Sequence, residues 1–363
     1  AASDVELGYD GNLYFADYGG GWSANRNGTV QVLRPTDEDA RTNGAETARM
    51  FEKGFSHRSI AELESLLDSA DQRVRQEAQF ALVEKGEKSI PTLIELIEEQ
   101  DDFALSSLHA LWALGQLYRE GVEEASGPIL SALQSEHPEL RANAARVAGD
   151  VGIGEARDLL ISALEDSSSR VVSLSAIALG RLSEPGDREA EDALFDAVGE
   201  NQGSDFEVGL RHSFLSALAR ISTAESLAEI SASDSYERRL MAVLLLRRLQ
   251  HQDLSLYLED SHNLVRHEAI RAVYDTPALN TPAGSKLISL ELADLPVYLQ
   301  LRILGAGFRS QSAEGARLLI RAAADLDLDE EARLFAMRGL ERWTEPPQFD
   351  AVLGDYRPMV ASN

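Results

Sequence analysis

The chain has 363 residues, of which 44% are hydrophobic, and its formal net charge is −27. Binding of nucleic-acid phosphates needs clustered positive charge, so this acidic balance argues against a nucleic-acid partner. The sequence contains no cysteine, which excludes disulfides, thiolate metal sites and covalent haem attachment within the chain. It also lacks an apolar run of about 18 residues, and we therefore expect no membrane insertion.

Residues 1–36 are predicted to form a short antiparallel β segment. Two alternating stretches flank Asp10-Gly11, which is a strong hairpin signal, and a second turn is expected at Asn27-Gly28 before a strand over residues 29–33. Three strands with one apolar face are not stable alone in water. We therefore expect this segment to pack against the first helices of the chain.

Residues 37–56 are predicted to be a linker with a leading helix, after which one motif returns about every 32 residues. A typical copy is Ala110-Leu111-Trp112-Ala113-Leu114-Gly115. The last residues of the nine copies fall at positions 83, 115, 149, 180, 219, 247, 274, 306 and 340. A period of this length indicates stacked supersecondary units that share one continuous core.

Each unit is predicted to be a pair of helices. Apolar residues recur at spacings of three and four in residues 90–97 and 104–117, as on one face of a helix. Many second helices open with a polar residue before a Val-Arg or Leu-Arg pair, and Asp71, Val74 and Arg75 are an example. This unit resembles the HEAT repeat, in the short form also seen in phycobilin lyase-like proteins. The predicted fold is an all-α HEAT-repeat solenoid of about nine helix pairs over residues 57–345, followed by a tail over residues 346–363.

A second resemblance concerns the order of the first two segments. Residues 8–17, with the Gly-Gly-Trp and Asn-Gly-Thr-Val that follow, are similar to the closing blade of a sorbosone/glucose dehydrogenase-type β-propeller. Residues 73–82 and 108–117 are similar to the HEAT region of the PVC-type haem-binding proteins, which are described as membrane-bound dehydrogenases. The resemblance implies a fragment of a larger periplasmic or secreted protein. Only the last propeller blade is present, and the haem-binding Cys-x-x-Cys-His is missing, so any redox chemistry would belong to other parts.

The second helices suggest a candidate binding surface, because in HEAT arrays they line the concave side and equivalent positions form rows. Arginines in these rows would suit an anionic glycan or an acidic partner, since the guanidinium group donates in a planar, bidentate manner. The aromatic end of the surface would stack a sugar or dock a protein. The competing interpretation is that the arginines pair with the abundant carboxylates, while Trp112 packs between repeats. The candidate residues are Phe80, His109, Trp112, Gln116, Arg146, Arg181, Arg220, Arg248 and Arg271.

The arginines that open the second helices are assigned a structural role instead. In HEAT arrays the Arg at this place bonds an Asp of a neighbouring unit, and the expected members of this ladder are Asp71, Arg75, Arg141 and Arg266.

The sequence contains no recognisable catalytic, metal or cofactor motif. None of the seven histidines forms the i, i+4 pair with a glutamate that marks a helical zinc site, and Gly-x-Ser-x-Gly is absent. We expect no catalytic site, metal site or cofactor within this chain. The predicted function is a non-catalytic scaffold that binds a protein partner or flanking domains of the same polypeptide. The alternative is the solenoid domain of a periplasmic, quinone-dependent sugar or alcohol dehydrogenase, linking a propeller to a c-type cytochrome domain. A lyase-like, chromophore-handling enzyme is a third hypothesis, which rests on repeat similarity alone.

Overall fold

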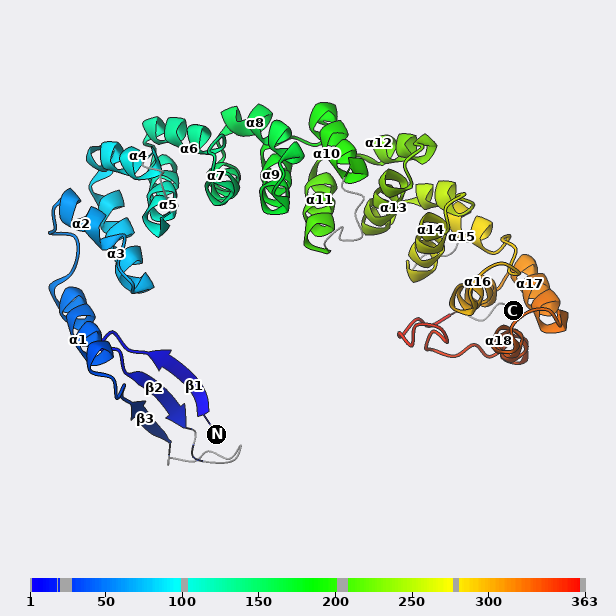
Figure 1. Cartoon of the computed structure of the whole chain (residues 1–363). Helices are drawn as coiled ribbons and strands as arrows, with labels where there is room; N and C mark the ends of the chain where they lie inside the picture. Colours follow the sequence, from blue (N-terminus) through cyan, green and yellow to red (C-terminus); the bar gives the residue numbers. More distant parts are fainter. Residues whose placement is uncertain are drawn as a thin grey trace. The chain divides into compact units, whose positions relative to one another are not determined.

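A computed structural model of the chain shows a small β-sheet followed by pairs of helices (Figure 1). The structure describes residues 2–17, 19, 28–98, 104–200, 208–276 and 281–359. It divides into two compact units, Ala1–Ala178 (unit 1) and Leu179–Asn363 (unit 2).

The sheet contains three antiparallel strands in the order β1-β2-β3: β1 (Ala2–Leu7), β2 (Leu13–Asp17) and β3 (Thr29–Leu33). The turn between the first two strands lies at Asp10-Gly11, as predicted, and the Asp10 carboxylate accepts from Asn12 N at 3.1 Å and from the Tyr14 hydroxyl at 2.9 Å. The expected second turn at Asn27 and the Gly-Gly-Trp segment before it lie outside the described residues.

The turn end of this sheet packs against helices. Tyr9 stacks on Phe51 of α1 (Glu38–Lys53) with ring centroids 3.9 Å apart, and Arg73 donates to the Leu7 carbonyl at 2.7 Å. Gly11, at φ 75°, brings the turn backbone directly against α1. The strands themselves remain open, because Val5 is 54% exposed and Val30 is 69% exposed. The expectation of a sheet packed on the first helices therefore holds for its turn end and not for its apolar side chains.

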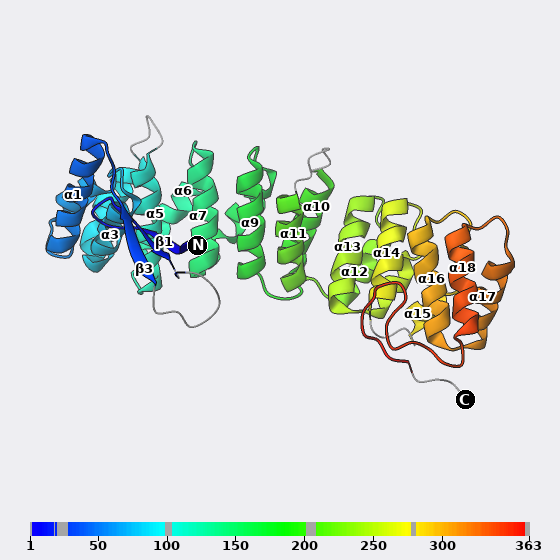
Figure 2. The same cartoon turned by 90° about the horizontal axis from the view of Figure 1, so that it is seen from below.

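The helices of each unit form two layers, with the first helix of every pair in one layer and the second helix in the other (Figure 1). In unit 1 the first helices are α2 (Ile60–Leu66), α4 (Ile90–Glu98), α6 (Ser126–Ala132) and α8 (Arg157–Ser162). The second helices are α3 (Gln72–Glu84), α5 (Leu105–Arg119), α7 (Pro138–Val151) and α9 (Ser169–Leu182), whose last residues fall in unit 2. Figure 2 shows α3, α5 and α7 side by side.

The described residues of unit 2 form five pairs. Their first helices are α10 (Arg188–Glu200), α12 (Ala224–Glu229), the 3-10 helix η6 (Gln252–Tyr257), α15 (Pro282–Leu287) and α17 (Ala313–Ala324). Their second helices are α11 (Val208–Ile221), α13 (Tyr236–Leu249), α14 (Asn263–Asp275), α16 (Val297–Ser310) and α18 (Glu330–Glu341). All nine motif positions of the sequence lie on second helices, which confirms the predicted all-α array of about nine helix pairs.

The small residues of the motif lie where neighbouring second helices touch. A Cβ added to Gly115 would lie 2.6 Å from Val147 Cγ1, and one added to Gly149 would lie 2.6 Å from Ala178 Cβ. The small residues of the motif therefore allow α5, α7 and α9 to approach one another closely. The apolar faces of these helices fill the core. No helix among the described residues is long and apolar enough to cross a bilayer.

Candidate functional site

The structure brings five of the nine candidate surface residues together in unit 1. Phe80, His109, Trp112, Gln116 and Arg146 line one groove of about 260 Å³ on α3, α5 and α7. The sequence did not single out the other three lining residues, which are Gln72, Gln76 and Gln79 of α3. Their spacing of four and three residues is typical of one helix face. This spacing could have identified the three glutamines from the sequence as a row of uncharged polar side chains.

A directional chain of hydrogen bonds fixes the floor of this groove. Arg75 Nε donates to His109 Nε2 at 3.3 Å, and His109 Nδ1 lies 2.7 Å from Gln79 Oε1. Gln79 Nε2 in turn donates to Gln116 Oε1 at 3.1 Å. Since His109 Nε2 accepts, its proton is on Nδ1, and the ring is the neutral tautomer that donates to Gln79.

The protonation state of His109 agrees with this chain. Burial first, and then the positive charge of Arg75, lower the pKa of His109 from 6.5 to about 4. Both ring nitrogens are engaged in hydrogen bonds, and only 6% of the residue is exposed. His109 therefore acts as a rigid polar connection between α3 and α5 and is a poor candidate for a proton-transfer group.

Trp112 and Phe80 provide the apolar walls. Trp112 Nε1 donates to Asn143 Oδ1 of α7 at 3.2 Å, and the Trp112 ring meets the His109 ring edge-on, with centroids 5.0 Å apart. These contacts hold the indole in one orientation before any ligand arrives. Phe80 is 38% exposed and lies between the exposed residues Gln76 and Glu84 on one face of α3, which is unusual for a phenylalanine.

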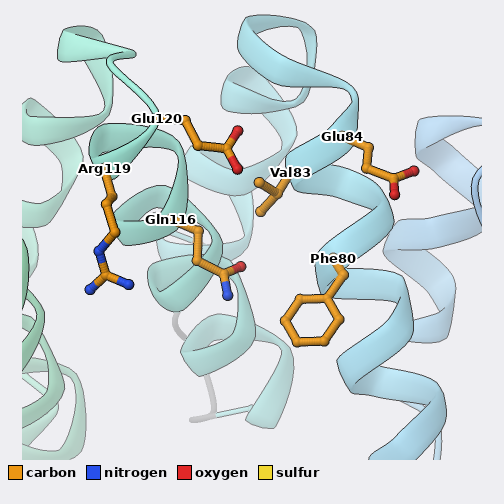
Figure 3. Close-up of a pocket in the computed structure, with 6 residues that line it drawn as sticks. All are labelled: Phe80, Val83, Glu84, Gln116, Arg119 and Glu120. Atoms are coloured by element: carbon orange, nitrogen blue, oxygen red, sulfur yellow. The ribbon is translucent and has the colours of Figure 1, made fainter.

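A second groove, of about 410 Å³, adjoins the first and shares Phe80 and Gln116 with it. In Figure 3 these two side chains point toward one another from α3 and α5, while Glu84 and Glu120 lie toward the same end. The Arg119 guanidinium points away from both carboxylates (Figure 3). Val83 completes this lining.

The four candidate arginines of unit 2 are exposed, and two of them have clear local partners. Arg220 Nε donates to the Gly180 carbonyl at 2.9 Å, and Arg271 pairs with Glu268 at 3.1 Å. Arg181 lies at the end of α9 and Arg248 near the end of α13. In unit 1, Arg146 is 3.6 Å from Asp150, one turn along the same helix, and its side chain remains 51% exposed.

The arginine ladder is clearest at Arg141. Arg141 Nη1 donates to the carbonyls of Ser135 and Glu136, while its Nε and Nη2 bind both oxygens of Asp166, in the next pair, at 2.7 and 3.0 Å. Arg239 repeats this geometry with Asp260, and both side chains of that pair are less than a tenth exposed. The Arg–Asp bonds raise the pKa of each arginine, and they hold the pKa of each aspartate below its usual value against the opposing effect of burial.

The other expected ladder members behave differently. Asp71 caps α3 by accepting from Arg73 N and pairs with the Arg73 side chain at 2.7 Å, because this arginine lies only two residues away. Arg75 bonds the carbonyls of Ser69 and Ala70 but directs its Nε to His109. Arg266 bonds Asn263, and its buried Nε has no hydrogen-bond partner in the described part of the chain. The sequence analysis missed Arg239, since it follows Arg238 and not a valine or leucine.

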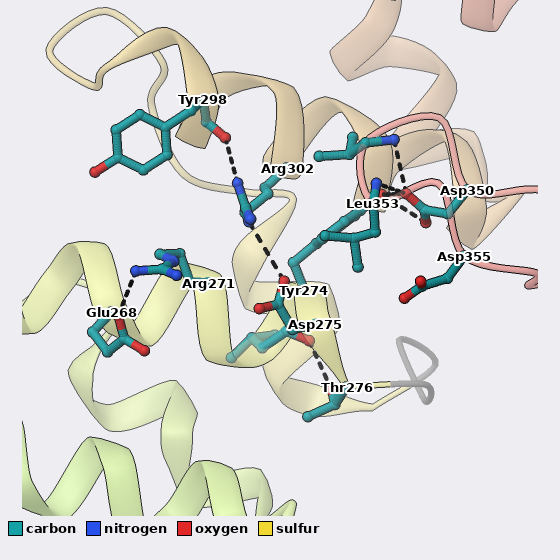
Figure 4. A network of polar contacts seen from close by, with 12 residues as sticks. Glu268, Arg271, Tyr274, Asp275, Thr276, Tyr298, Arg302, Asp350, Leu353 and Asp355 are labelled. Carbon is teal, nitrogen blue, oxygen red and sulfur yellow. Dashed lines mark hydrogen bonds and ion pairs between the residues drawn. The ribbon is translucent and has the colours of Figure 1, made fainter. Parts of the chain in front are cut away.

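A buried polar network in unit 2 fastens the C-terminal tail to α14 and α16 (Figure 4). The Tyr274 hydroxyl donates to Asp350 at 2.8 Å, and the backbone nitrogens of Val352 and Leu353 donate to the same carboxylate at 2.9 Å. Arg309 lies 3.2 Å from Asp350, whose side chain is fully buried. Among the described residues, no group of His, Asp or Glu side chains is arranged to hold a metal ion.

The comparisons with known proteins agree with this architecture. Residues 126–219 match the family model described as HEAT repeats. These residues run from α6 to α11, so the match covers pairs in both units. The search of curated proteins found no match. The fold is thus an α-solenoid of HEAT-type helix pairs with a short N-terminal sheet.

Several solved structures resemble parts of the chain at low identity. Human deoxyhypusine hydroxylase in complex with glycerol is 19% identical, with a TM-score of 0.29, over 78% of this chain and 95% of that one. The complex of CpcE and CpcF of phycocyanin lyase from Nostoc sp. PCC7120 is 23% identical, with a TM-score of 0.32, over 69% and 86%. Importin beta is 13% identical, with a TM-score of 0.48, over 85% and 51%.

Proposed function

We propose that the chain is a non-catalytic HEAT-repeat scaffold that binds a protein partner, and that the groove on α3, α5 and α7 is one of its docking surfaces. The observation that supports this most is the preorganised groove floor, where Arg75, His109, Gln79 and Gln116 form one hydrogen-bonded chain beside the aromatic walls. A rigid surface loses little entropy on binding, and a repeat array presents extended surfaces of this kind.

The chemistry of the groove favours binding over catalysis. Its described lining consists of glutamines, aromatic rings, one arginine and a histidine whose two nitrogens are already used. Such a lining has no activated nucleophile and no free base, but it offers amide donors and apolar contact area.

The test is selection of random peptides displayed on phage against the full chain. Selected peptides should bind a Phe80→Ala variant at least tenfold more weakly, as expected when an exposed aromatic anchor of an interface is removed. The matched control is Phe349→Ala, which removes a 58% exposed phenylalanine in unit 2 and should leave binding unchanged. Failure to enrich any peptide sequence would contradict the proposed function.

A second candidate function is the solenoid domain of a larger periplasmic or secreted dehydrogenase that links a propeller to a c-type cytochrome. The observation in its favour is the open sheet, whose Val5 and Val30 have no cover, as expected if more sheet lies beside it in the complete protein. The native protein, purified from its source, should then have a mass well above 39.6 kDa and the absorbance of c-type haem. A haem-free native protein would exclude this function.

A further inference from the structure

The two grooves of unit 1 form one surface between α3 and α5. Both are lined by Phe80 and Gln116, and the residues on either side belong to the same two helices, with Arg146 of α7 at one flank. The lining starts at Gln72, the first residue of α3, and reaches Glu84, its last residue. We call this surface the α3–α5 groove.

The length of the α3–α5 groove sets the size of its occupant. Gln72 and Glu84 are twelve residues apart on α3, which corresponds to about 18 Å along the helix axis at 1.5 Å per residue. An extended peptide advances about 3.3 Å per residue, so about five residues fit along the groove.

The two parts of the groove differ in charge. In the part lined by the glutamines, the only charged lining residue described is Arg146 of α7, which lies 3.6 Å from Asp150, an i+4 neighbour whose side chain is 35% exposed. In the other part Glu84, Glu120 and Arg119 line the groove, which gives a net charge of −1 from two carboxylates and one guanidinium. Figure 3 shows the guanidinium directed away from those carboxylates, so this part presents negative charge.

The middle of the groove offers a hydrogen-bond donor next to apolar walls. The carbonyl oxygen of Gln116 accepts from Gln79, which leaves its NH₂ group toward the groove without an acceptor in the part of the chain that the structure describes. The hydrogen-bonded chain from Arg75 to Gln79 holds the amide in this orientation. A backbone carbonyl of an extended peptide is a suitable acceptor for that donor.

We propose that the α3–α5 groove binds an extended segment of about five residues from a partner protein. The segment carries an acidic side chain toward Arg146, an apolar side chain between Phe80 and Trp112, and a basic side chain toward Glu84 and Glu120. Charge of opposite sign in the two parts of the groove fixes the direction of the segment, and the Gln116 amide holds its backbone. This proposal rests on the proposed function and specifies the partner of the same site.

The experiment uses pools of capped pentapeptides in which each position is fixed in turn, tested on the full chain. Wild type should prefer an acidic residue near one end, an aromatic or aliphatic residue in the middle and a basic residue near the other end. The Arg146→Glu variant should reverse the preference at the acidic position, and Glu84→Lys with Glu120→Lys should reverse it at the basic position. Because exposed charge pairs are weak, the change expected at each position is about three- to fivefold, and it should shrink at high salt.

Matched controls separate these effects from changes in net charge. Arg317→Glu changes an arginine that is 70% exposed on α17, and Glu341→Lys changes the last residue of α18 as Glu84→Lys changes that of α3. Both controls should keep the wild-type preferences. The substituted positions are at the surface, and an unchanged helical circular dichroism spectrum checks the folding of every variant.

Three results would overturn the proposal. Peptides that bind with preferences unaffected by the charge reversals would remove the α3–α5 groove as their site, although the proposed scaffold function would stand. Binding of neutral or acidic oligosaccharides, but of no peptide pool, with loss of that binding in Trp112→Ala, would identify a glycan site instead. Failure of both the pools and the displayed peptides would overturn the scaffold function as well.

Discussion

At the residue scale, the burial of His109 makes the free energy of unfolding depend on pH. The folded chain keeps His109 neutral down to its pKa of about 4, whereas the unfolded chain takes up a proton near 6.5. Between these values the unfolded state binds more protons, so the free energy of unfolding rises with pH. The contribution is complete above about pH 7, is lost as pH falls from 6.5 to 4, and amounts to about 3 kcal/mol at 1.36 kcal/mol per pKa unit.

Urea denaturation of wild type and His109→Gln at a series of pH values measures this contribution. The glutamine variant keeps a polar side chain at the position but does not titrate. The difference in unfolding free energy between the two proteins should change between pH 6.5 and 4 and stay constant above pH 7. A difference that does not depend on pH would show that His109 is protonated as easily in the folded chain as in the unfolded one.

Gly149 is a second residue that we expect to affect stability, because the structure leaves no room for a side chain at this position. An alanine Cβ there would lie 2.7 Å from Ala178 Cα, which is backbone and cannot rotate away. We expect Gly149→Ala to lower the free energy of unfolding by about 2 kcal/mol, despite the better helix propensity of alanine. Gly209→Ala is the matched control, because nothing lies within 4 Å of the added atom, and it should stabilise by about 0.5 kcal/mol. Thermal melts of both variants measure the contrast, and equal shifts would contradict the close packing of α7 on α9.

At the scale of elements, the Asp350 carboxylate is one attachment of the tail to α14 and α16, and Arg357, which donates to the carbonyls of Tyr274 and Asp275, is another. Replacing Asp350 by asparagine removes the negative charge opposite Arg309 and one of the acceptors used by Tyr274, Val352 and Leu353. Breaking a buried ion pair on one side typically costs about 3 kcal/mol, so the tail should open more often. Hydrogen exchange of residues 352–357 should therefore accelerate in Asp350→Asn.

The control for this prediction is Asp355→Asn, which changes an aspartate whose side chain is 63% exposed in the same segment. Exchange in the control should match that of wild type, and exchange of α3 and α5 should be the same in all three proteins. Unchanged exchange of the tail in Asp350→Asn would show that other contacts, such as the bonds from Arg357 to the carbonyls of Tyr274 and Asp275, hold it in place.

The arginine ladder shows what the sequence reveals at this scale. The position of Arg141 could be predicted from its place at the start of a second helix, and so could a partner in the next pair. The identity of the partner could not, because Asp166 lies in a short connection after α8, whose conformation the period does not determine. The partner of Asp71 could not be predicted either, because Asp71 pairs with Arg73, two residues away, and not with an arginine of a neighbouring helix pair.

At the scale of the whole molecule, the helix pairs were predictable because their motif repeats nine times, and its small residues, such as Gly115, Gly149 and Gly180, lie where neighbouring second helices touch. The exposure of the sheet could not be predicted, because the alternation of apolar and polar residues identifies strands but does not show what covers them. The groove was predictable only in part. Its aromatic and arginine row follows from equivalent positions, but the bonds from Gln79 to His109 and Gln116 join residues 30 and 37 positions apart, and only the stacking of α3 on α5 brings them together.

The most direct test of the account is a hydrogen-exchange footprint of a selected peptide on the full chain. The α3–α5 groove predicts slower exchange in residues 72–84 and 105–120 when peptide is bound, with no change in the helices of unit 2. The same peptide should produce no footprint on Phe80→Ala. Protection confined to unit 2 or to the first helices α2 and α4, with α3 and α5 unchanged, would contradict the claim that this groove is the docking surface.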